Sequence, residues 1–264
     1  MRFNRYILFL FIFLFSCKKS ETGEKYTALI IGHAGAGLHV DLHSFPDNSS
    51  EAIAHAIYSG VVAVEIDVQM TIDHQLVAFH DNYLDSRTTH TGCIGSITWE
   101  ELSSVVYSLY PGYSPEKLNE IDFFGCQQVF LDLKFFNHCT EESASYEMIK
   151  TVLSDFISSS ALPQVALIST NSSLLAYLSD LPVHLAYEEV DYTKLKNQVV
   201  IHEIEYCVIR NSKITKEQVD ELQALGKKVI IFDAKSFEGN QTVLKKKPDY
   251  LMTDDLVSAL SLTK

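Results

Sequence analysis

The sequence VAVEIDVQMTIDHQLVAFHD, residues 62–81, contains two apolar runs joined by a short polar connection. The runs Val62–Met70 and Leu76–Asp81 have the nearly continuous apolar character of strands that are buried on both faces. Five residues separate them, whereas a crossover between parallel strands needs a dozen or more. We therefore predict that the two runs form an antiparallel hairpin that closes near Asp73 and His74.

Beyond this hairpin, short apolar runs alternate with segments of helical periodicity, which is typical of βαβ units and a parallel sheet. About eight such units in residues 28–264 predict an α/β fold, a TIM-type (β/α)8 barrel. A doubly wound open sheet is the alternative, but the turn Gly32–Gly37 lacks the GxGxxG pattern of that fold. The irregular stretch 107–125 is expected to be a small insertion over one end of the barrel.

The remaining expected strands are Leu29–His33, Val129–Lys134, Gln164–Thr170, Val183–Glu189, Tyr206–Asn211, Lys228–Ala234 and Asp249–Asp255. Helices are expected at Ser49–Ser59, Ser143–Ser158 and Thr215–Leu225. The last begins with a Ser/Thr-type cap, because Thr215 precedes Lys-Glu-Gln, and Gly226 is suited to end it.

The N-terminus has the layout of an export signal, with two arginines before the apolar run Tyr6–Phe15. This run is too short to span a bilayer as a helix. Cys17 follows a small residue and precedes a polar segment, which resembles the lipobox of bacterial lipoproteins, where that Cys is acylated. A buried N-terminal helix is the alternative. We expect a signal peptide at 1–16, a lipidated tether at 17–27 and one barrel domain at 28–264, exported and anchored in a membrane on the periplasmic or cell-surface side.

The composition excludes one class of partner and constrains another. The chain has 21 Lys and Arg against 34 Asp and Glu, a net charge of -13, which argues against nucleic acid as a partner. The acidic balance does not exclude a small anionic substrate, because such a substrate needs only a bound metal ion or a local positive charge. Besides Cys17, an exported chain could pair Cys93, Cys126, Cys139 and Cys207 in up to three ways.

Ionisable side chains interrupt or end several of the apolar strands, where burial is costly unless charges are paired or bind a metal. Glu65 and Asp67 are two positions apart and share one face of their strand, across from or diagonal to His80. With Asp132 they make an oxygen-rich set that suits Ca²⁺ or Mg²⁺.

Two histidines and a lysine accompany these carboxylates. His33 and His80 are suited to proton transfer near neutral pH, and Lys134 could meet an anionic oxygen. In a barrel, all of these strand-end residues would lie at the active-site end. A divalent metal, two acid/base histidines and a cation together predict phosphoryl-transfer chemistry.

The order and spacing of these residues resemble the motifs of the glycerophosphodiester phosphodiesterase family. That family has HRG on the first strand, PEN[TS] opening a helix, ExDV followed by TxDxxxVxxHD, then RTT and Gly, ExK, and TD near the end. This chain has His33-Ala34-Gly35, Pro46-Asp47-Asn48-Ser49, Glu65-Ile66-Asp67-Val68, Thr71-Ile72-Asp73, Val77, His80-Asp81, Arg87-Thr88-Thr89, Gly92, Asp132-Leu133-Lys134 and Thr253-Asp254. The match is densest over residues 30–102.

The resemblance implies a metal-dependent barrel that hydrolyses glycerophosphodiesters to glycerol 3-phosphate and an alcohol. It implies Glu65, Asp67 and Asp132 as ligands of the divalent metal, and His33 and His80 as acid/base residues whose individual roles stay open. Two rival functions remain. One is cleavage of intact lipids or sphingolipids on the same fold, and the other is non-catalytic binding of phosphodiesters by a surface lipoprotein.

Lys134 and Asn48 are expected to contact substrate, although capping of the following helix is the favoured role for Asn48. His39 and His43, in the loop after the first strand, could also touch substrate, although a structural role is favoured.

Three positions depart from the family pattern. Ala34 replaces an arginine, which removes a bidentate phosphate donor. Asp132 replaces a glutamate and is one methylene shorter. Phe232-Asp233 stands where the family often has Trp-Thr, and Asp233 is expected to add negative charge at the mouth, which disfavours highly anionic substrates.

Overall fold

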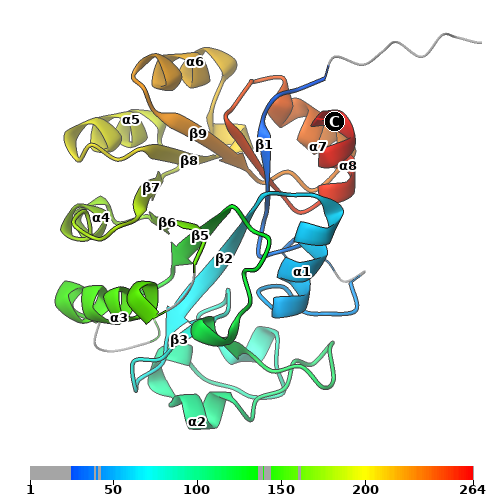
Figure 1. Ribbon diagram of the computed structural model, residues 1–264, viewed down its shortest axis with the longest axis vertical. Coiled ribbons are helices and arrows are strands. Elements are labelled where there is room, and N and C mark those ends of the chain that lie inside the picture. Colours follow the sequence, from blue (N-terminus) through cyan, green and yellow to red (C-terminus); the bar gives the residue numbers. More distant parts are fainter. Residues whose placement is uncertain are drawn as a thin grey trace, which may run out of the picture.

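The computed structural model describes residues 25–38, 40, 43–135, 139, 144–159 and 162–263. Within them, eight parallel strands form a closed ring, because β1 pairs with both β10 and β2 (Figure 1). The ring consists of β1 (Leu29–Gly32), β2 (Ala63–Met70), β5 (Gln128–Leu133), β6 (Gln164–Ser169), β7 (His184–Glu188), β8 (Tyr206–Arg210), β9 (Lys228–Phe232) and β10 (Tyr250–Thr253). The prediction of a TIM-type barrel is confirmed. The expected signal peptide and the expected lipidation site at Cys17 lie outside the described residues.

Helices lie outside the ring of strands, as Figure 1 shows. They are α1 (Ser50–Ser59), α3 (Tyr146–Ser159), α4 (Ser172–Tyr177), α5 (Tyr192–Ile201), α6 (Lys216–Ala224), α7 (Phe237–Leu244) and α8 (Leu256–Thr263). The expected cap of α6 is present, since Thr215 and Gln218 form a capping box. Gly226 has a φ of 74°, which favours glycine just after a helix. None of the described helices has the length and apolarity required to cross a membrane.

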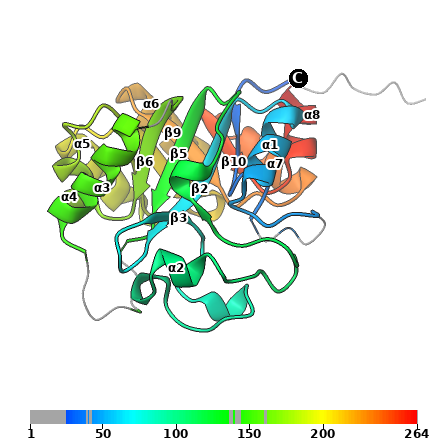
Figure 2. The same cartoon turned by 60° about the horizontal axis from the view of Figure 1, so that its bottom comes forward.

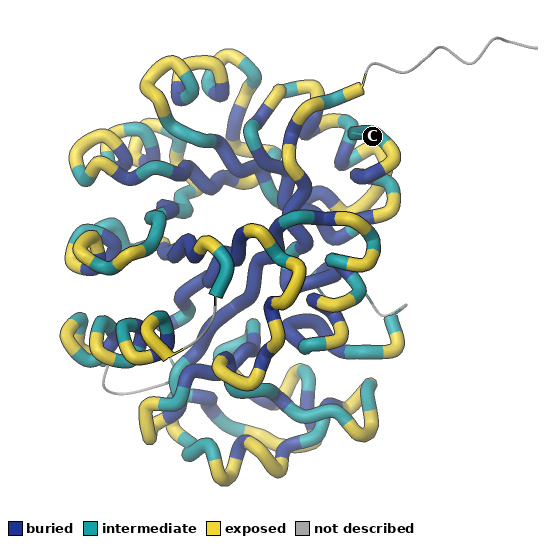
Figure 3. The backbone as a smooth tube through the Cα atoms, in the orientation of Figure 1, coloured by how far each residue is buried: buried dark blue, intermediate teal, exposed yellow. Residues whose placement is uncertain are grey.

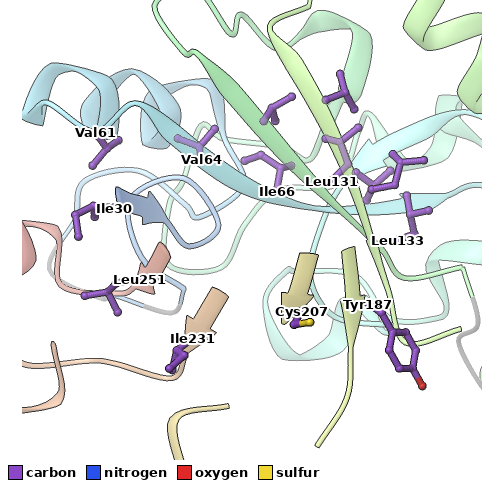
Figure 4. Packing of buried hydrophobic residues seen from close by; sticks show 14 of the residues in the cluster. Ile30, Val61, Val64, Ile66, Leu131, Leu133, Tyr187, Cys207, Ile231 and Leu251 are labelled. Carbon is purple, nitrogen blue, oxygen red and sulfur yellow. The ribbon is translucent and has the colours of Figure 1, made fainter. Parts of the chain in front are cut away.

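Side-chain alternation along the strands divides the core into two layers. Val64, Ile66, Leu131 and Leu133 point outward and pack in the layer between strands and helices (Figure 4). The other layer fills the barrel and includes Ile31, Ala63, Phe130, Ala166, Ile168, Ala186, Tyr206, Val208, Ile230, Tyr250 and Met252. In Figure 3 the strands are accordingly buried, whereas the exposed residues lie mostly on the outer helices and loops.

The predicted hairpin is confirmed. β2 pairs with β3 (Leu76–Ala78) in antiparallel fashion, with Met70 opposite Leu76. β4 (Glu116–Lys117) pairs with β3 in turn. The chain between β3 and β5 adds α2 (Trp99–Leu102) and the short 3-10 turns η1 (Leu84–Ser86), η2 (Ile94–Ser96) and η3 (Leu118–Glu120); a fourth, η4 (Asn211–Lys213), follows β8.

The segment between β3 and β5 has a small core of its own. It begins earlier in the sequence than the insertion expected at 107–125. Its core comprises Val77, Phe79, Leu84, Ile94, Leu102, Val105 and Tyr107. A disulfide between Cys93 and Cys139 ties it to the segment after β5, while Cys126 and Cys207 are free thiols. Figure 2 shows β3 and α2 at one end of the barrel. We call residues 76–120 the insertion.

The two ends of the barrel have different neighbours. The carboxyl ends of the strands point toward the insertion (Figure 2). At the opposite end the described chain starts beside its last helix, where the Tyr26 backbone N–H donates to the Leu262 carbonyl. Whatever precedes residue 25 therefore joins the barrel at the end away from the insertion.

Candidate active site

A cavity of about 230 Å³ opens at the carboxyl ends of the barrel strands. It is lined by His33, Leu38, Glu65, His80, Asp132, Lys134, Ile168, Glu188, Val208, Arg210, Phe232, Asp233, Lys235, Met252 and Asp254. Most of the polar members occupy the last inward-pointing position of their strand or the loop just beyond it. In TIM barrels this end carries the active site.

The carboxylates of Glu65, Asp67 and Asp132 come together at one wall of the cavity. Asp67 and Asp132 are direct partners in the pairing of β2 with β5, and Glu65 lies two positions before Asp67 on the same face. One oxygen from each of the three lies within 4.8 Å of the others, and all three residues are buried. The shorter Asp132 therefore still reaches the cluster.

Lys134 and Asn48 hold the cluster together. The Lys134 ammonium lies 3.2 Å from Asp67 Oδ1 and also pairs with Asp132. The Asn48 amide donates to Asp67 Oδ2 at 2.9 Å, and its carbonyl accepts from the Asp67 backbone at 2.8 Å. The preference for Asn48 as helix cap is wrong, because Ser49 accepts from Ala52 and caps α1. The buried Asp67 carboxylate therefore takes both ends of the Asn48 amide, while the adjacent Ser49 satisfies the start of the helix.

The cluster is incompletely neutralised by the protein itself. Burial, with repulsion from Asp67 and Asp132, raises the pKa of Glu65. Burial also raises the pKa of Asp132 despite Lys134. Burial opposes ionisation of Asp67 too, but Lys134, the two histidines and the Asn48 hydrogen bond together outweigh it and lower the pKa of Asp67. Glu65 Oε1 is buried without a hydrogen-bond partner, so this all-oxygen set fits a hard divalent cation.

Each histidine is held by a carboxylate through Nδ1. His33 Nδ1 lies 2.7 Å from Asp254 Oδ1, and its Nε2 lies 3.9 Å from Glu65 Oε2. His80 Nδ1 lies 2.6 Å from Asp81 Oδ1. Such contacts fix the ring orientation and leave Nε2 to exchange protons. Burial opposes protonation of His80, but the Asp81 hydrogen bond and the Asp67 charge raise its pKa.

Ala34, which stands in place of the family arginine, serves the cluster through its backbone. Its N–H donates to Glu65 Oε2 at 2.8 Å, and its φ of 47° bends the chain directly after His33. The next residue must be small, because a Cβ on Gly35 would lie 2.8 Å from the Cβ of Ala52 in α1. This tight turn places His33 beside the carboxylates.

Several cavity residues were not identified from the sequence. Glu188 ends β7, and burial raises its pKa to about 7. Arg210 ends β8, and Lys235 follows β9. Strand alternation alone could have indicated Glu188 and Arg210, because each lies two positions beyond an interior residue.

The expectation that Asp233 adds net negative charge at the mouth needs correction. Asp233 Oδ2 lies 2.8 Å from Arg210 Nη1, and Lys235 is 4.0 Å from the other oxygen. Its charge is therefore compensated. Of the two loop histidines, His39 lies outside the described residues. His43 contacts the Ala36 carbonyl and does not line the cavity.

Comparison with known proteins matches residues 41–255 to the model of the glycerophosphoryl diester phosphodiesterase family. The chain belongs to that family. Among its members, a glycerophosphodiester phosphodiesterase of Bacillus altitudinis is 39% identical over 59 residues, which cover 22% of this chain and 24% of the relative. The human glycerophosphodiester phosphodiesterase 1 is 35% identical over 72 residues, 27% of this chain and 20% of the relative. The matched segments thus span about a quarter or less of these curated members.

Solved structures in the family share the whole fold. A putative glycerophosphoryl diester phosphodiesterase from Silicibacter pomeroyi superposes with a TM-score of 0.79 at 20% identity, covering 91% of this chain and 94% of that one. A phosphodiesterase from Oleispira antarctica, solved in complex with the product sn-glycerol-3-phosphate, has a TM-score of 0.76 at 20% identity, covering 89% and 96%.

Proposed function

We propose that this protein hydrolyses glycerophosphodiesters to glycerol 3-phosphate and an alcohol with the help of a divalent metal, Ca²⁺ or Mg²⁺. The observation that carries the proposal is the meeting of the three buried carboxylates, the two carboxylate-held histidines and Lys134 around one cavity. Family membership supports the reaction class. The sn-glycerol-3-phosphate bound in the Oleispira antarctica structure supports glycerol 3-phosphate as the proposed product.

Glu65, Asp67 and Asp132 are the residues that would hold the metal. A bound divalent cation would supply Lewis-acid stabilisation of the negative charge on the phosphate oxygens. Lys134 would meet a further phosphate oxygen as a point charge, since its ammonium lies at the edge of the cluster and lines the cavity. Asn48 has both ends of its amide engaged with Asp67, so it positions that ligand rather than the substrate.

His33 and His80 would move the protons. In our proposal, the glycerol hydroxyl next to the scissile phosphate ester attacks phosphorus and gives its proton to one histidine Nε2. The other histidine, protonated, gives its proton to the leaving alkoxide, and water then opens the cyclic phosphate. Asp254 and Asp81 keep each ring in the tautomer that presents Nε2.

We also propose export and anchoring through Cys17. The disulfide between Cys93 and Cys139 supports an oxidising compartment. The chain enters the barrel at the end away from the insertion and the cavity. The eight residue-to-residue steps from Cys17 to Lys25 span at most about 28 Å, so the anchor would hold the cavity facing away from the membrane. That arrangement favours small water-soluble diesters over intact lipids.

The test is an assay of the full chain in detergent with glycerophosphocholine, Ca²⁺ or Mg²⁺, and enzymatic detection of glycerol 3-phosphate. We expect turnover that EDTA abolishes and that His80→Ala lowers at least about 100-fold. Lys216→Ala on the surface of α6 is the matched control and should retain full turnover. Full metal-dependent hydrolysis by His80→Ala would refute the mechanism. Phosphorus NMR of products from intact phospholipid would reveal the lipid-cleaving alternative.

A further inference from the structure

The wall of the cavity opposite the carboxylate cluster carries positive charge. Around the ring of eight strands, β8 lies four places from β2, and β9 lies four places from β5. Arg210 at the end of β8 and Lys235 just after β9 therefore face the cluster across the barrel, and both line the same cavity. Two cations at this wall oppose three carboxylates at the other.

The direction of Arg210 follows from its strand. Tyr206 and Val208 of β8 fill the barrel interior, so Arg210 is the next inward position. Its guanidinium carbon lies 5.2 Å from the centre of the Phe232 ring, and its side chain is 44% exposed. Stacking on an aromatic ring and an ion pair with Asp233 hold the fork at the mouth, where a ligand can reach it.

Lys235 and Asp233 lie beside Arg210, and we call these three residues the rim of the cavity. The Lys235 ammonium lies 4.0 Å from Asp233 and 3.9 Å from Asp254 Oδ2, distances that leave room for another anion to approach. Arg210, Lys235 and Asp233 together carry one net positive charge, and Asp254, which Lys235 also approaches, pairs with His33. Because Ala34 replaces the family arginine, Arg210 is the one guanidinium that lines the cavity in the described part of the chain.

The cavity lining also includes Glu188 of β7 and several apolar side chains. The apolar members include Ile168, Val208, Phe232 and Met252. A substrate with its phosphodiester at the cluster and Lys134 would lay its alcohol moiety across these side chains. The far end of that moiety would reach the rim.

We propose that Arg210, assisted by Lys235, binds a second anionic group on the alcohol side of the substrate. The preferred substrates are glycerophosphodiesters whose alcohol carries a carboxylate or a phosphate, and Arg210 is the residue that selects them. This inference rests on the proposed function. It reverses the expectation that the mouth disfavours highly anionic substrates.

The test compares glycerophosphoserine with glycerophosphoethanolamine, which differ by a single carboxylate. For the full chain with saturating metal, kcat/KM should favour glycerophosphoserine by about tenfold, the value of one charge-assisted hydrogen bond at a half-exposed site. Arg210→Ala should bring the ratio of the two kcat/KM values close to one. Arg210→Lys should keep part of the preference, because a lysine retains the charge and loses the fork.

Asp233→Asn is a second variant with the opposite expected sign. Asp233 has a φ of 67°, a conformation that asparagine tolerates, so the backbone should keep its path. Removing this competing carboxylate should raise the preference for glycerophosphoserine about threefold. Lys216→Ala, on the outer helix α6, should leave both substrates unaffected.

The outcomes separate the two proposals. Equal loss of kcat/KM on both substrates in Arg210→Ala would mean that this residue acts on the scissile phosphate or on folding. Unchanged kcat/KM values for both substrates would mean that it does not recognise the carboxylate. Either result overturns the inference alone. If the unsubstituted protein hydrolyses neither compound with Ca²⁺ or Mg²⁺, the proposed function fails and the inference fails with it.

Discussion

Replacing Glu65 by Gln should have opposite effects on the metal-free and metal-bound protein. Glu65 is the member of the cluster that Lys134 does not contact, and its Oε1 is buried without a partner. At 4.8 Å and an effective dielectric constant of about 20, two like charges repel by about 3.5 kcal/mol. This is the scale of the repulsion that the substitution can relieve for each charged neighbour in the absence of metal.

The pH dependence has a defined sign. Because the pKa of Glu65 is raised in the fold, the folded state holds this proton more tightly than the unfolded state. The stability it contributes is present below the unfolded pKa and is lost as pH rises through the folded pKa. Glutamine has no proton to lose, so in EDTA the variant should be at least as stable as the unsubstituted protein, with a gap that widens as pH rises.

Metal should reverse this order. A ligand at 100 times its Kd stabilises the folded state by about 2.7 kcal/mol, which is roughly a 5–10 °C rise in Tm for a domain of this size. We expect this rise with Ca²⁺ or Mg²⁺ in the unsubstituted protein and in the exposed control Glu217→Gln, but not in Glu65→Gln. Differential scanning calorimetry at two pH values, with EDTA or metal, measures both effects. A Glu65→Gln protein that keeps the full metal-induced shift, or is less stable than the unsubstituted protein in EDTA at every pH, would refute the reasoning.

Three further predictions concern the groups around the cluster. Asp254→Ala, which removes the acceptor for His33 Nδ1, should lower kcat about 100-fold with little change in KM, as steady-state kinetics would show; an unchanged kcat would exclude a positioning role. Asp81→Asn replaces the charged acceptor of His80 Nδ1 by a neutral one, which removes the Asp81 charge and weakens the hydrogen bond that together raise the pKa of His80; the limb of the kcat/KM pH profile governed by His80 should therefore move to lower pH, and a profile that stays in place would contradict the assignment. Reduction of the disulfide, whose cysteines are 46 residues apart, should cost up to about 4 kcal/mol and lower Tm in dithiothreitol, whereas an unchanged Tm would mean that the loop it closes is already ordered without it.

Much of the barrel could be predicted because its signals are local. Five residues between Met70 and Leu76 cannot hold a crossover helix, so the hairpin followed from chain length alone. Helices such as α4 and α7 were not predicted, because a short helix packed on a barrel takes its stability from burial rather than from its own periodicity. The insertion was underestimated for a similar reason, since its 3-10 turns and small core depend on contacts between residues distant in sequence.

The disulfide shows the same limit. Sequence left three connectivities open, because cysteine spacing says nothing of which loops meet in space. The fold brings the insertion beside the segment after β5 and so pairs Cys93 with Cys139, while Cys126 and Cys207 stay apart as free thiols.

The sequence by itself determined the alternation of strands and helices in βαβ units and the strand face that Glu65 and Asp67 share. It also determined the set of residue types from which a phosphodiesterase site could be built. Only the tertiary structure decided which of them meet. Closing the ring brings β10 beside β1, so the Asp254 carboxylate contacts His33. It also puts Arg210 across the cavity from the carboxylates. Alternation along a strand is a local property of the backbone, whereas the distance across a barrel depends on all eight strands pairing at once.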